Sequence, residues 1–286
     1  MQRSPRNTSS DSFLTRIDFY RAQVDLALQK ELRQRQESPF FAPFVDAFAG
    51  GKRLRPIIVL LAYNSVGGRA GDPLPAAVAV ELAHMESLIH DDIIDGDGIR
   101  RKAKAFHAVH GQEMALLSAD FILSMILSIT ARYEDPRITS ALAEATAIMC
   151  EGELTERFIY RTKKVRPGVY QEMVSKKTAS LFEAAATLGA LIGGGTPRDV
   201  RTLATYAHAL GVAYQVCDDI IDWSQSRPIM LDLDEISCSQ DEYLQEIAAT
   251  KVNEAIESLQ HLKSSEARKD LTQMAKCVEL NQIDRI

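Results

Sequence analysis

Apolar residues recur at helical spacing along almost the whole chain. Between Asp199 and Trp223 they advance by three or four residues and mark one buried stripe, formed by Leu203, Tyr206, Leu210, Tyr214, Cys217 and Ile221. Alternating runs that would indicate strands are short and rare. The pattern therefore predicts an all-α protein.

Turn-forming residues divide this pattern into separate helices. Gly50-Gly51 precedes a basic turn and the apolar run PIIVLLAYNSV, in which Pro56 suits the first position of a helix. GGRAGDPLP ends that helix and begins the next one. We expect about ten helices with short connections, the last two near 241–262 and 265–280.

Length and composition bound the domain organisation. The chain has 286 residues, of which 46% are hydrophobic and 25% charged, the balance of a soluble globular protein. We find no linker, so we expect one domain over residues 1–286, with residues 1–12 disordered. The periodicity weakens across 224–240, which we expect to be a loop. We expect neither a secretory signal nor a segment apolar enough to span a bilayer.

Charge and cysteine content exclude several classes of protein. The formal net charge of -6 argues against nucleic acid as the main partner. The four cysteines are scattered and form no CxxC pair, which indicates neither a disulfide framework nor a zinc site. We therefore expect a protein of the reducing cytoplasm.

Two acidic strings stand inside apolar runs, SLIHDDIID at 87–95 and YQVCDDIIDW at 214–223. On a helix, Asp91 and Asp95 are one turn apart, and Asp92 is also a near neighbour of Asp95. Two carboxylates about 5.5 Å apart repel by roughly 3 kcal/mol at an effective dielectric of about 20. Like charges in a partly buried helix require a proton or a cation.

Magnesium is the cation that these residues favour. Hard oxygen ligands without cysteine suit Mg²⁺, or Mn²⁺ as the alternative, better than zinc. Because Mg²⁺ commonly binds through one or two carboxylates plus substrate phosphates, two facing acidic helices predict a diphosphate clamp. Asp218, Asp219 and Asp222 would form its second half. One acidic string alone is more often a solvated face, but two strings with matching apolar flanks favour the clamp.

Three basic clusters complement the acidic strings. They are Lys52, Arg53 and Arg55; Arg100 and Arg101; and Lys176 and Lys177. Arginine makes bidentate contacts to phosphate, and lysine acts as a point charge. Each cluster alone is more often an exposed patch, whereas their occurrence together with two acidic strings favours a phosphate site.

These motifs resemble those of the trans (all-E) isoprenyl diphosphate synthases, and the geranylgeranyl diphosphate synthases among them. The resemblance runs from about Gly50 to Trp223, through GGKRLRP, ELAHMESLIHDDIID, the pair Arg100-Arg101, His107, KTASLF and YQVCDDIID. It implies an all-α bundle around a central cavity, usually a homodimer. The implied reaction elongates an allylic diphosphate with isopentenyl diphosphate.

The resemblance also implies roles for individual residues. The two aspartate-rich motifs would hold Mg²⁺ on the allylic diphosphate, through Asp91, Asp92, Asp95, Asp218, Asp219 and Asp222. The positions matching those that bind isopentenyl diphosphate are Lys52, Arg55, His84 and Arg101. The positions matching allylic contacts are Arg100, Lys177, Thr178 and Gln215.

The expected chemistry needs no protein nucleophile, because cations stabilise the departing diphosphate and an apolar pocket protects the allylic cation from water. In the family, bulky aromatics one turn before the first aspartates shorten the product. This chain has Glu86 and Ser87 there. We therefore predict a product of C20 or longer.

The chain departs from the family pattern after the second motif. A Gly-Lys loop and a GKxTxP-like stretch are missing, and Arg227 is the only cation between Asp218 and Gln240. RRKAKAFH stands where the family favours a Gly and a Pro, and SAD at 118–120 replaces a usual Gly-Asp. The loss of the lysines in the missing stretches should weaken closure over the diphosphate. We therefore keep as an alternative that activity is low or needs a second protein, as in a heteromer.

Three rival interpretations follow. A non-catalytic subunit would explain the lost loop, although such subunits often lose an aspartate motif that this chain keeps. A class I terpene cyclase shares the fold, but its second motif usually has Ser where Asp222 stands. A di-iron bundle is suggested by Glu81-x-x-His84, yet it needs a second ExxH, which does not occur.

Overall fold

The computed structural model describes residues 8–48, 50–96, 98–100, 103–162, 164–225, 230–233, 238–280 and 282. Their α-helices are α1 (Thr8–Arg33), α2 (Phe41–Ala47), α3 (Leu54–Ser65), α4 (Leu74–Asp95), α5 (Phe106–His110), α6 (Gln112–Thr130), α7 (Pro136–Thr162), α8 (Pro167–Val174), α9 (Ser180–Ile192), α10 (Pro197–Gln225), α11 (Gln240–Ser258) and α12 (Glu266–Glu279). A π-helical turn, Ser175–Ala179, joins α8 to α9, and a 3₁₀ turn, Leu259–His261, follows α11.

Strands are confined to two short pairs. β1 (Ile99–Arg100) pairs antiparallel with β2 (Ala103–Lys104), and β3 (Lys164–Val165) pairs parallel with β4 (Met230–Leu231). Each strand has two residues, so the prediction of an all-α protein is confirmed.

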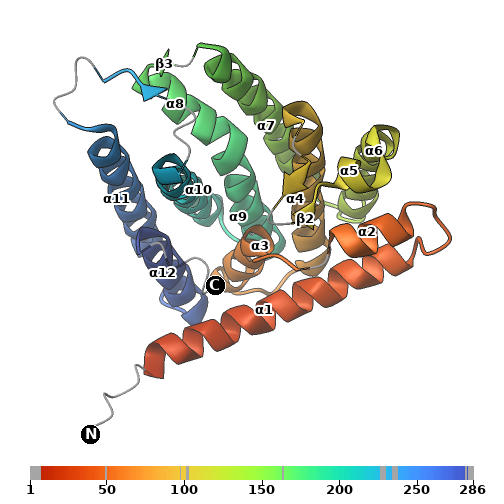
Figure 1. Cartoon of the computed structure of the whole chain (residues 1–286). Helices are drawn as coiled ribbons and strands as arrows, with labels where there is room; N and C mark the ends of the chain where they lie inside the picture. The colour runs from red at the N-terminus through yellow and green to blue at the C-terminus, as the bar shows by residue number, and fades with distance from the viewer. Residues whose placement is uncertain are drawn as a thin grey trace, which may run out of the picture.

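The helices form a bundle around α3 (Figure 1). α3 packs against α4, α9 and α12, while α10 lies between α9 and α11. α1 runs along the base of the bundle, and α4, α7, α9 and α10 stand above it. The two acidic strings lie towards the C-terminal ends of α4 and α10, both of which belong to this bundle.

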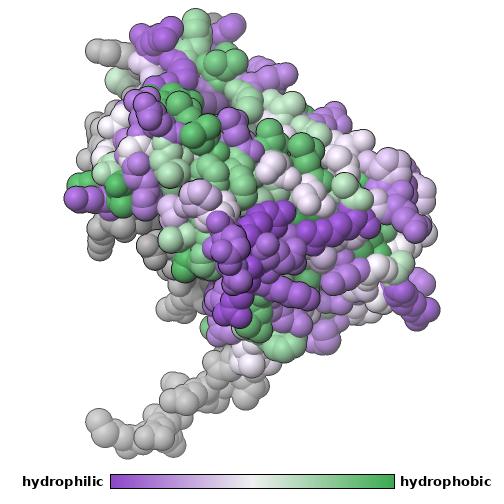
Figure 2. Space-filling view, turned by 90° about the vertical axis from the view of Figure 1, so that its right-hand side faces the viewer, coloured by the Kyte–Doolittle hydropathy of each residue, from purple (hydrophilic) through white to green (hydrophobic). Residues whose placement is uncertain are grey.

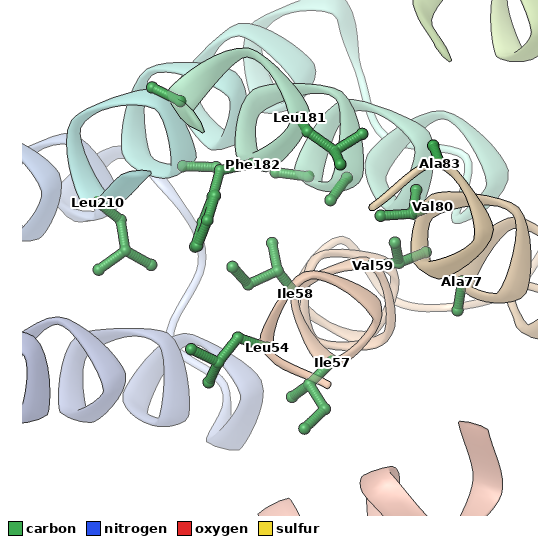
Figure 3. Packing of buried hydrophobic residues seen from close by; sticks show 14 of the residues in the cluster. Leu54, Ile57, Ile58, Val59, Ala77, Val80, Ala83, Leu181, Phe182 and Leu210 are labelled. Carbon is green, nitrogen blue, oxygen red and sulfur yellow. The ribbon is translucent and has the colours of Figure 1, made fainter. Parts of the chain in front are cut away.

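The core is built from aliphatic side chains of α3, α4 and α9 (Figure 3). Ile58 and Val59 of α3 are fully buried, as are Val80 of α4 and Leu181 of α9. α3 and α9 approach so closely that a Cβ on Gly189 would lie 2.2 Å from the carbonyl oxygen of Val59. Glycine is therefore required there, because a backbone atom cannot move aside as a flexible side chain can.

The predicted helix boundaries hold with small corrections. α3 begins at Leu54, so Pro56 is the third helical residue and not the first. Residues 8–12 belong to α1, contrary to the prediction of disorder over 1–12, while residues 1–7 lie outside the described residues. In the predicted α10 stripe Tyr214 is half-buried and Ile221 is exposed, while the other four residues are buried. Of the predicted loop 224–240, residues 224 and 225 belong to α10, residues 230 and 231 form β4, and residue 240 begins α11.

α6 differs from expectation. Its residues Gln112–Thr130 are long and apolar enough to cross a membrane, although core helices of soluble proteins pass the same test. The prediction that no segment meets this criterion is therefore wrong. About half of α6 is buried, against α4, and the opposite face exposes Leu116, Leu117, Leu123 and Leu127. Figure 2 shows hydrophobic residues at the surface on the side where α5 and α6 lie.

A buried ion-pair network holds the turn before α3. Arg53 adopts a left-handed conformation with φ of 55°, which is uncommon for a residue with a side chain. Its guanidinium donates to Glu81 at 2.6 Å, to Asp25 at 2.9 Å and to the carbonyl oxygen of Phe48. Arg53 and Glu81 are both buried. Arg53, which the sequence grouped with a phosphate-binding cluster, therefore orients the turn that carries Lys52 and Arg55.

We predict that Arg53→Ala lowers the free energy of unfolding by about 3–5 kcal/mol, because Glu81 would stay buried without its partner. Arg137→Ala is the matched control, since its pair with Asp135 is exposed and should contribute little to stability. Urea denaturation at pH 7 measures both. Equal losses in the two variants would contradict the role assigned to Arg53.

Candidate active site

The two acidic strings meet across α7. Glu156 of α7 lies within electrostatic range of Asp95 from the first string and of Asp219 from the second. Tyr160, one turn further along α7, also senses both aspartates, and the pKa of its phenol rises to about 12 through burial and the nearby Glu156. Glu156 and Tyr160 are therefore close to both acidic strings, while the clamp formed by the two strings stays a prediction.

The first string occupies the last turn of α4. The helix ends at Asp95, where Gly96 takes a left-handed conformation with φ of 72°. Asp92 is buried, Asp91 is partly buried, and Asp95 is exposed. The negative end of the helix dipole adds to the three carboxylates, so this turn strongly favours a bound cation.

Lys177 lies inside this cluster of carboxylates. Its Nζ is 2.6 Å from Glu153, forms an ion pair with Glu156, and is 3.8 Å from Asp91. Burial lowers the pKa of Lys177, but Glu156 and Asp91 raise it by more, so the net pKa lies above its usual value. Lys177 thus stays charged at any physiological pH. The sequence analysis missed Glu153 and Glu156, whose spacing of three residues in EGELTE was the available signal.

Asp95 is also paired in the structure. Arg157 of α7 donates to its Oδ1 at 2.6 Å and to the carbonyl oxygen of Ile94. The sequence analysis did not single out Arg157. Two cations, Arg157 of α7 and Lys177 of the π-helical turn, therefore balance the first acidic string.

The second string is held by a chain of hydrogen bonds. Tyr170 donates to Asp219 at 2.5 Å, Gln215 donates to the other oxygen of Asp219 at 2.9 Å, and Thr178 donates to Gln215 at 2.8 Å. Burial raises the pKa of Asp219 to about 6, although these hydrogen bonds oppose the rise. Both oxygens of Asp219 accept hydrogen bonds from protein donors, which fixes the orientation of this carboxylate.

The donor set fits a hard divalent cation. Among the side chains that the structure describes, no three His, Cys, Asp or Glu residues converge closely enough to hold an ion. The carboxylates of Asp91 and Asp95 instead contact Lys177 and Arg157. All the same, every candidate ligand is a carboxylate oxygen, which is what Mg²⁺ prefers. The side chain of Asp222 lies outside the described residues.

A cationic cavity borders the first string. It has a volume of about 370 Å³, and its walls include Lys52, Arg55, His84, Lys104 and Asp92. The guanidinium of Arg55 also lies 4.6 Å above the ring of Phe182. The structure thus brings together Lys52, Arg55 and His84, as predicted. The side chain of Arg100 and all of Arg101 lie outside the described residues.

A larger hollow of about 680 Å³ lies between α10 and α11. Its walls carry charges of both signs, from Arg198, Arg201, Glu254 and Glu257, and it includes neither acidic string. Size alone does not make a site, so we assign the chemistry to the smaller cavity beside Asp92.

Comparison with known proteins identifies the family. The family described as Polyprenyl synthetase matches residues 39–279 of this chain. The chain belongs to that family.

Individual relatives agree with this assignment. A geranylgeranyl diphosphate synthase of Methanosarcina mazei is 37% identical over 213 residues, which cover 72% of this chain and 66% of that protein. An octaprenyl diphosphate synthase of Haemophilus influenzae is 35% identical over 175 residues, covering 61% of this chain and 53% of the relative. The chain thus aligns with between half and two thirds of these relatives' length.

The fold is shared with solved structures. The crystal structure of geranylgeranyl pyrophosphate synthetase from Pyrococcus horikoshii has a TM-score of 0.82, with 27% identity, and the match covers 95% of this chain and 99% of that one. The resemblance to the trans isoprenyl diphosphate synthases is therefore confirmed. The roles of the individual site residues stay predictions.

One residue of the chain has an unusual carboxyl group. Glu86, one turn before Asp91 on α4, is partly buried, and burial together with the nearby Asp120 raises its pKa to about 7. Glu86 is therefore mostly neutral below pH 7. Placing a neutral carboxyl beside a hydrocarbon costs less free energy than placing a charged carboxylate there.

We predict that Glu86→Gln increases stability much less at pH 5 than at pH 8.5, where the gain is about 2 kcal/mol. Because the folded-state pKa is raised, the native protein binds this proton more tightly, and stability is lost as pH rises towards 7. Urea unfolding at both pH values is the measurement, with the exposed Glu113→Gln as control. A gain at pH 5 equal to that at pH 8.5 would contradict the prediction.

Proposed function

We propose that this chain is a magnesium-dependent trans-prenyltransferase. It condenses isopentenyl diphosphate with an allylic diphosphate and yields an all-trans prenyl diphosphate of C20 or longer. The observation that carries the proposal is the cationic cavity of Lys52, Arg55 and His84, which shares Asp92 with the carboxylate cluster. Two anionic substrates would thereby lie side by side, one in each site.

The carboxylates would hold the metal through Asp91, Asp92, Asp95, Asp218 and Asp222. When bound, Mg²⁺ supplies positive charge to the departing diphosphate, with Mn²⁺ as the alternative ion. Arg100, Lys177, Thr178 and Gln215 would contact the allylic substrate. Lys177 would stabilise charge on its diphosphate directly, since its raised pKa keeps it protonated.

The cationic cavity would bind the second substrate through Lys52, Arg55, His84 and Arg101. Its wall also contains Met85, Leu88, Ile89 and Tyr214, which are apolar or aromatic. Such a wall excludes water from the allylic cation. Holding the double bond of isopentenyl diphosphate beside that cation makes the coupling effectively unimolecular. The released diphosphate would take the final proton.

Asp219 has a supporting role in this proposal. Tyr170 and Gln215 each donate a hydrogen bond to Asp219, and Thr178 donates one to Gln215, so the side chain of Gln215 is held from both sides. Asp219 would therefore orient Gln215 towards the substrate and leave metal binding to its neighbours. The shortened loop after the second motif favours, as a second candidate, activity only in a heteromer.

We propose that a second copy of this chain covers the exposed face of α6. The seam Leu116, Leu123 and Leu127 follows the spacing of seven and four residues that suits helix pairing. Leu154 and Phe158 of α7 are also exposed, by 72% and 64%. Burying such apolar surface favours association. None of the four cysteines forms a disulfide, and we propose a cytoplasmic location, where thiols stay reduced.

We predict that the purified protein, given Mg²⁺, isopentenyl diphosphate and C5, C10 or C15 primers, forms elongated diphosphates of C20 or longer. Chelation with EDTA should abolish turnover and added Mg²⁺ should restore it. Mass spectrometry of the products is the measurement. Products that stop at C15 would refute the predicted length, cyclic hydrocarbons would indicate a cyclase, and turnover only with a second protein would indicate a heteromer.

We predict that Asp91→Ala or Asp218→Ala lowers turnover at least about a hundredfold, given the usual size of charge stabilisation. Asp18→Ala, at an exposed aspartate of α1, is the control and should retain normal turnover. Near-normal rates in both test variants would count against the metal clamp.

We predict that Leu123→Glu combined with Leu127→Glu converts the dimer to a monomer, because two charges would have to be buried at its seam. Analytical ultracentrifugation measures the mass. Leu26→Glu, at a position of α1 that is 66% exposed, should leave the dimer intact. A monomeric unmodified protein would exclude the proposed interface.

A further inference from the structure

A π-helical turn interrupts the helix that carries Lys177. Ser175–Ala179 is the one π-helical segment among the described residues, and it lies between α8 and α9. π-helical turns are rare and are found frequently at functional sites. This one presents Lys177 to Glu153 and Glu156, and Thr178 to Gln215.

The turn changes the backbone hydrogen bonds around it. The N–H of Ser180 donates to the carbonyl of Ser175, five residues back, and not to Lys176 as it would in an α-helix. The hydroxyl of Ser180 donates instead to the carbonyl of Lys176, at 2.7 Å. Because Ser180 is buried, water cannot easily replace this hydroxyl as the donor to the carbonyl of Lys176.

Two glycines of neighbouring helices touch the turn. A Cβ on Gly152 of α7 would lie 2.4 Å from the backbone nitrogen of Lys177 and 2.7 Å from its Cα. On the other side, a Cβ on Gly211 of α10 would lie 2.8 Å from the Cα of Ala179. Real Cβ atoms do not approach backbone so closely, so both helices need glycine where they meet the turn.

A side-chain hydrogen bond anchors the start of the turn. Ser175 Oγ lies 2.8 Å from His208 Nε2 of α10. The turn is thus fixed at its beginning by His208, at its end by Ser180, and along its side by Gly152. From this fixed turn Lys177 reaches Glu153 and Glu156 and Thr178 reaches Gln215, while Lys176 pairs with Glu151 and Glu172.

We infer that Gly152 and Ser180 are positioning residues for the allylic diphosphate. They hold the π-helical turn in the place from which Lys177 and Thr178 contact the ligand. The identity of the ligand rests on the proposed function, whereas the geometry of the turn does not. Displacing the backbone at Lys177 would weaken diphosphate binding without affecting the separate cavity of Lys52, Arg55 and His84.

The test compares Gly152→Ala with Gly168→Ala. Gly168 lies in α8, where an added Cβ would meet nothing within 4 Å. Isothermal titration with inorganic diphosphate and Mg²⁺ should show at least about tenfold weaker binding for Gly152→Ala, the usual scale of a lost charge-assisted contact. Gly168→Ala should bind like the unmodified protein.

Steady-state kinetics separates positioning from general damage. Gly152→Ala should raise KM for the allylic diphosphate and leave KM for isopentenyl diphosphate unchanged. Unchanged diphosphate binding, or an equal rise in both KM values, would overturn the inference.

Ser180→Ala is a second test of the inference. It adds no atom at Gly152, so it does not require the fold to accept a larger side chain there. It should weaken diphosphate binding in the same direction, by a factor of about three to ten. Ser65→Ala is its control, because Ser65 is also buried and donates to a backbone carbonyl, that of Ala62, at 2.8 Å. Should Gly152→Ala fail to fold, unchanged binding in Ser180→Ala would overturn the inference.

The two proposals fail differently. Diphosphate binding without elongation by the unmodified protein would refute the proposed synthase and leave the comparison of Gly152 with Gly168 decisive for the turn. Elongation together with unchanged binding in Gly152→Ala and Ser180→Ala would refute the positioning role alone. Absence of diphosphate binding by the unmodified protein would refute both.

Discussion

Repulsion between carboxylates at the meeting point of α4, α7 and α10 is the constraint on which the site depends. Asp91, Glu153 and Glu156 crowd around one lysine, Lys177, and the end of the α4 dipole adds further negative charge. Without cations this end of the bundle would push its helices apart. Lys177 and Arg157 balance part of the charge, and the excess of oxygen ligands over protein cations makes the site receptive to divalent metal.

Close helix packing brings that charge together. Glycines let helices approach to backbone contact, at Gly189 between α3 and α9 and at Gly152 between α7 and the π-helical turn. The first contact belongs to the core, and the second belongs to the site. The same physical device, removal of a Cβ, therefore serves both stability and the placement of Lys177.

The buried pair of Arg53 and Glu81 connects the base of the bundle to the cationic cavity. Arg53 lies in the loop that supplies Lys52 and Arg55, but it is directed inward and balanced by acids. Lys52, Arg53 and Arg55 all border the cavity, but the guanidinium of Arg53 is buried and paired with Asp25 and Glu81. Burial, and not residue type, makes the distinction.

The sequence by itself determined the helical class, most helix positions and the two acidic strings, because these depend on local periodicity and on residue type. It also contained the motifs by which the family is recognised. Only the tertiary structure decided that Glu153, Glu156 and Arg157 join the site, that Arg53 is buried in ion pairs with Asp25 and Glu81, and that α6 keeps an apolar face. Ion pairs and burial depend on which helices meet, and helical spacing along one segment contains no information about its neighbours. The π-helical turn likewise arises from contacts with α7 and α10, since its own residues would equally allow a regular α-helix.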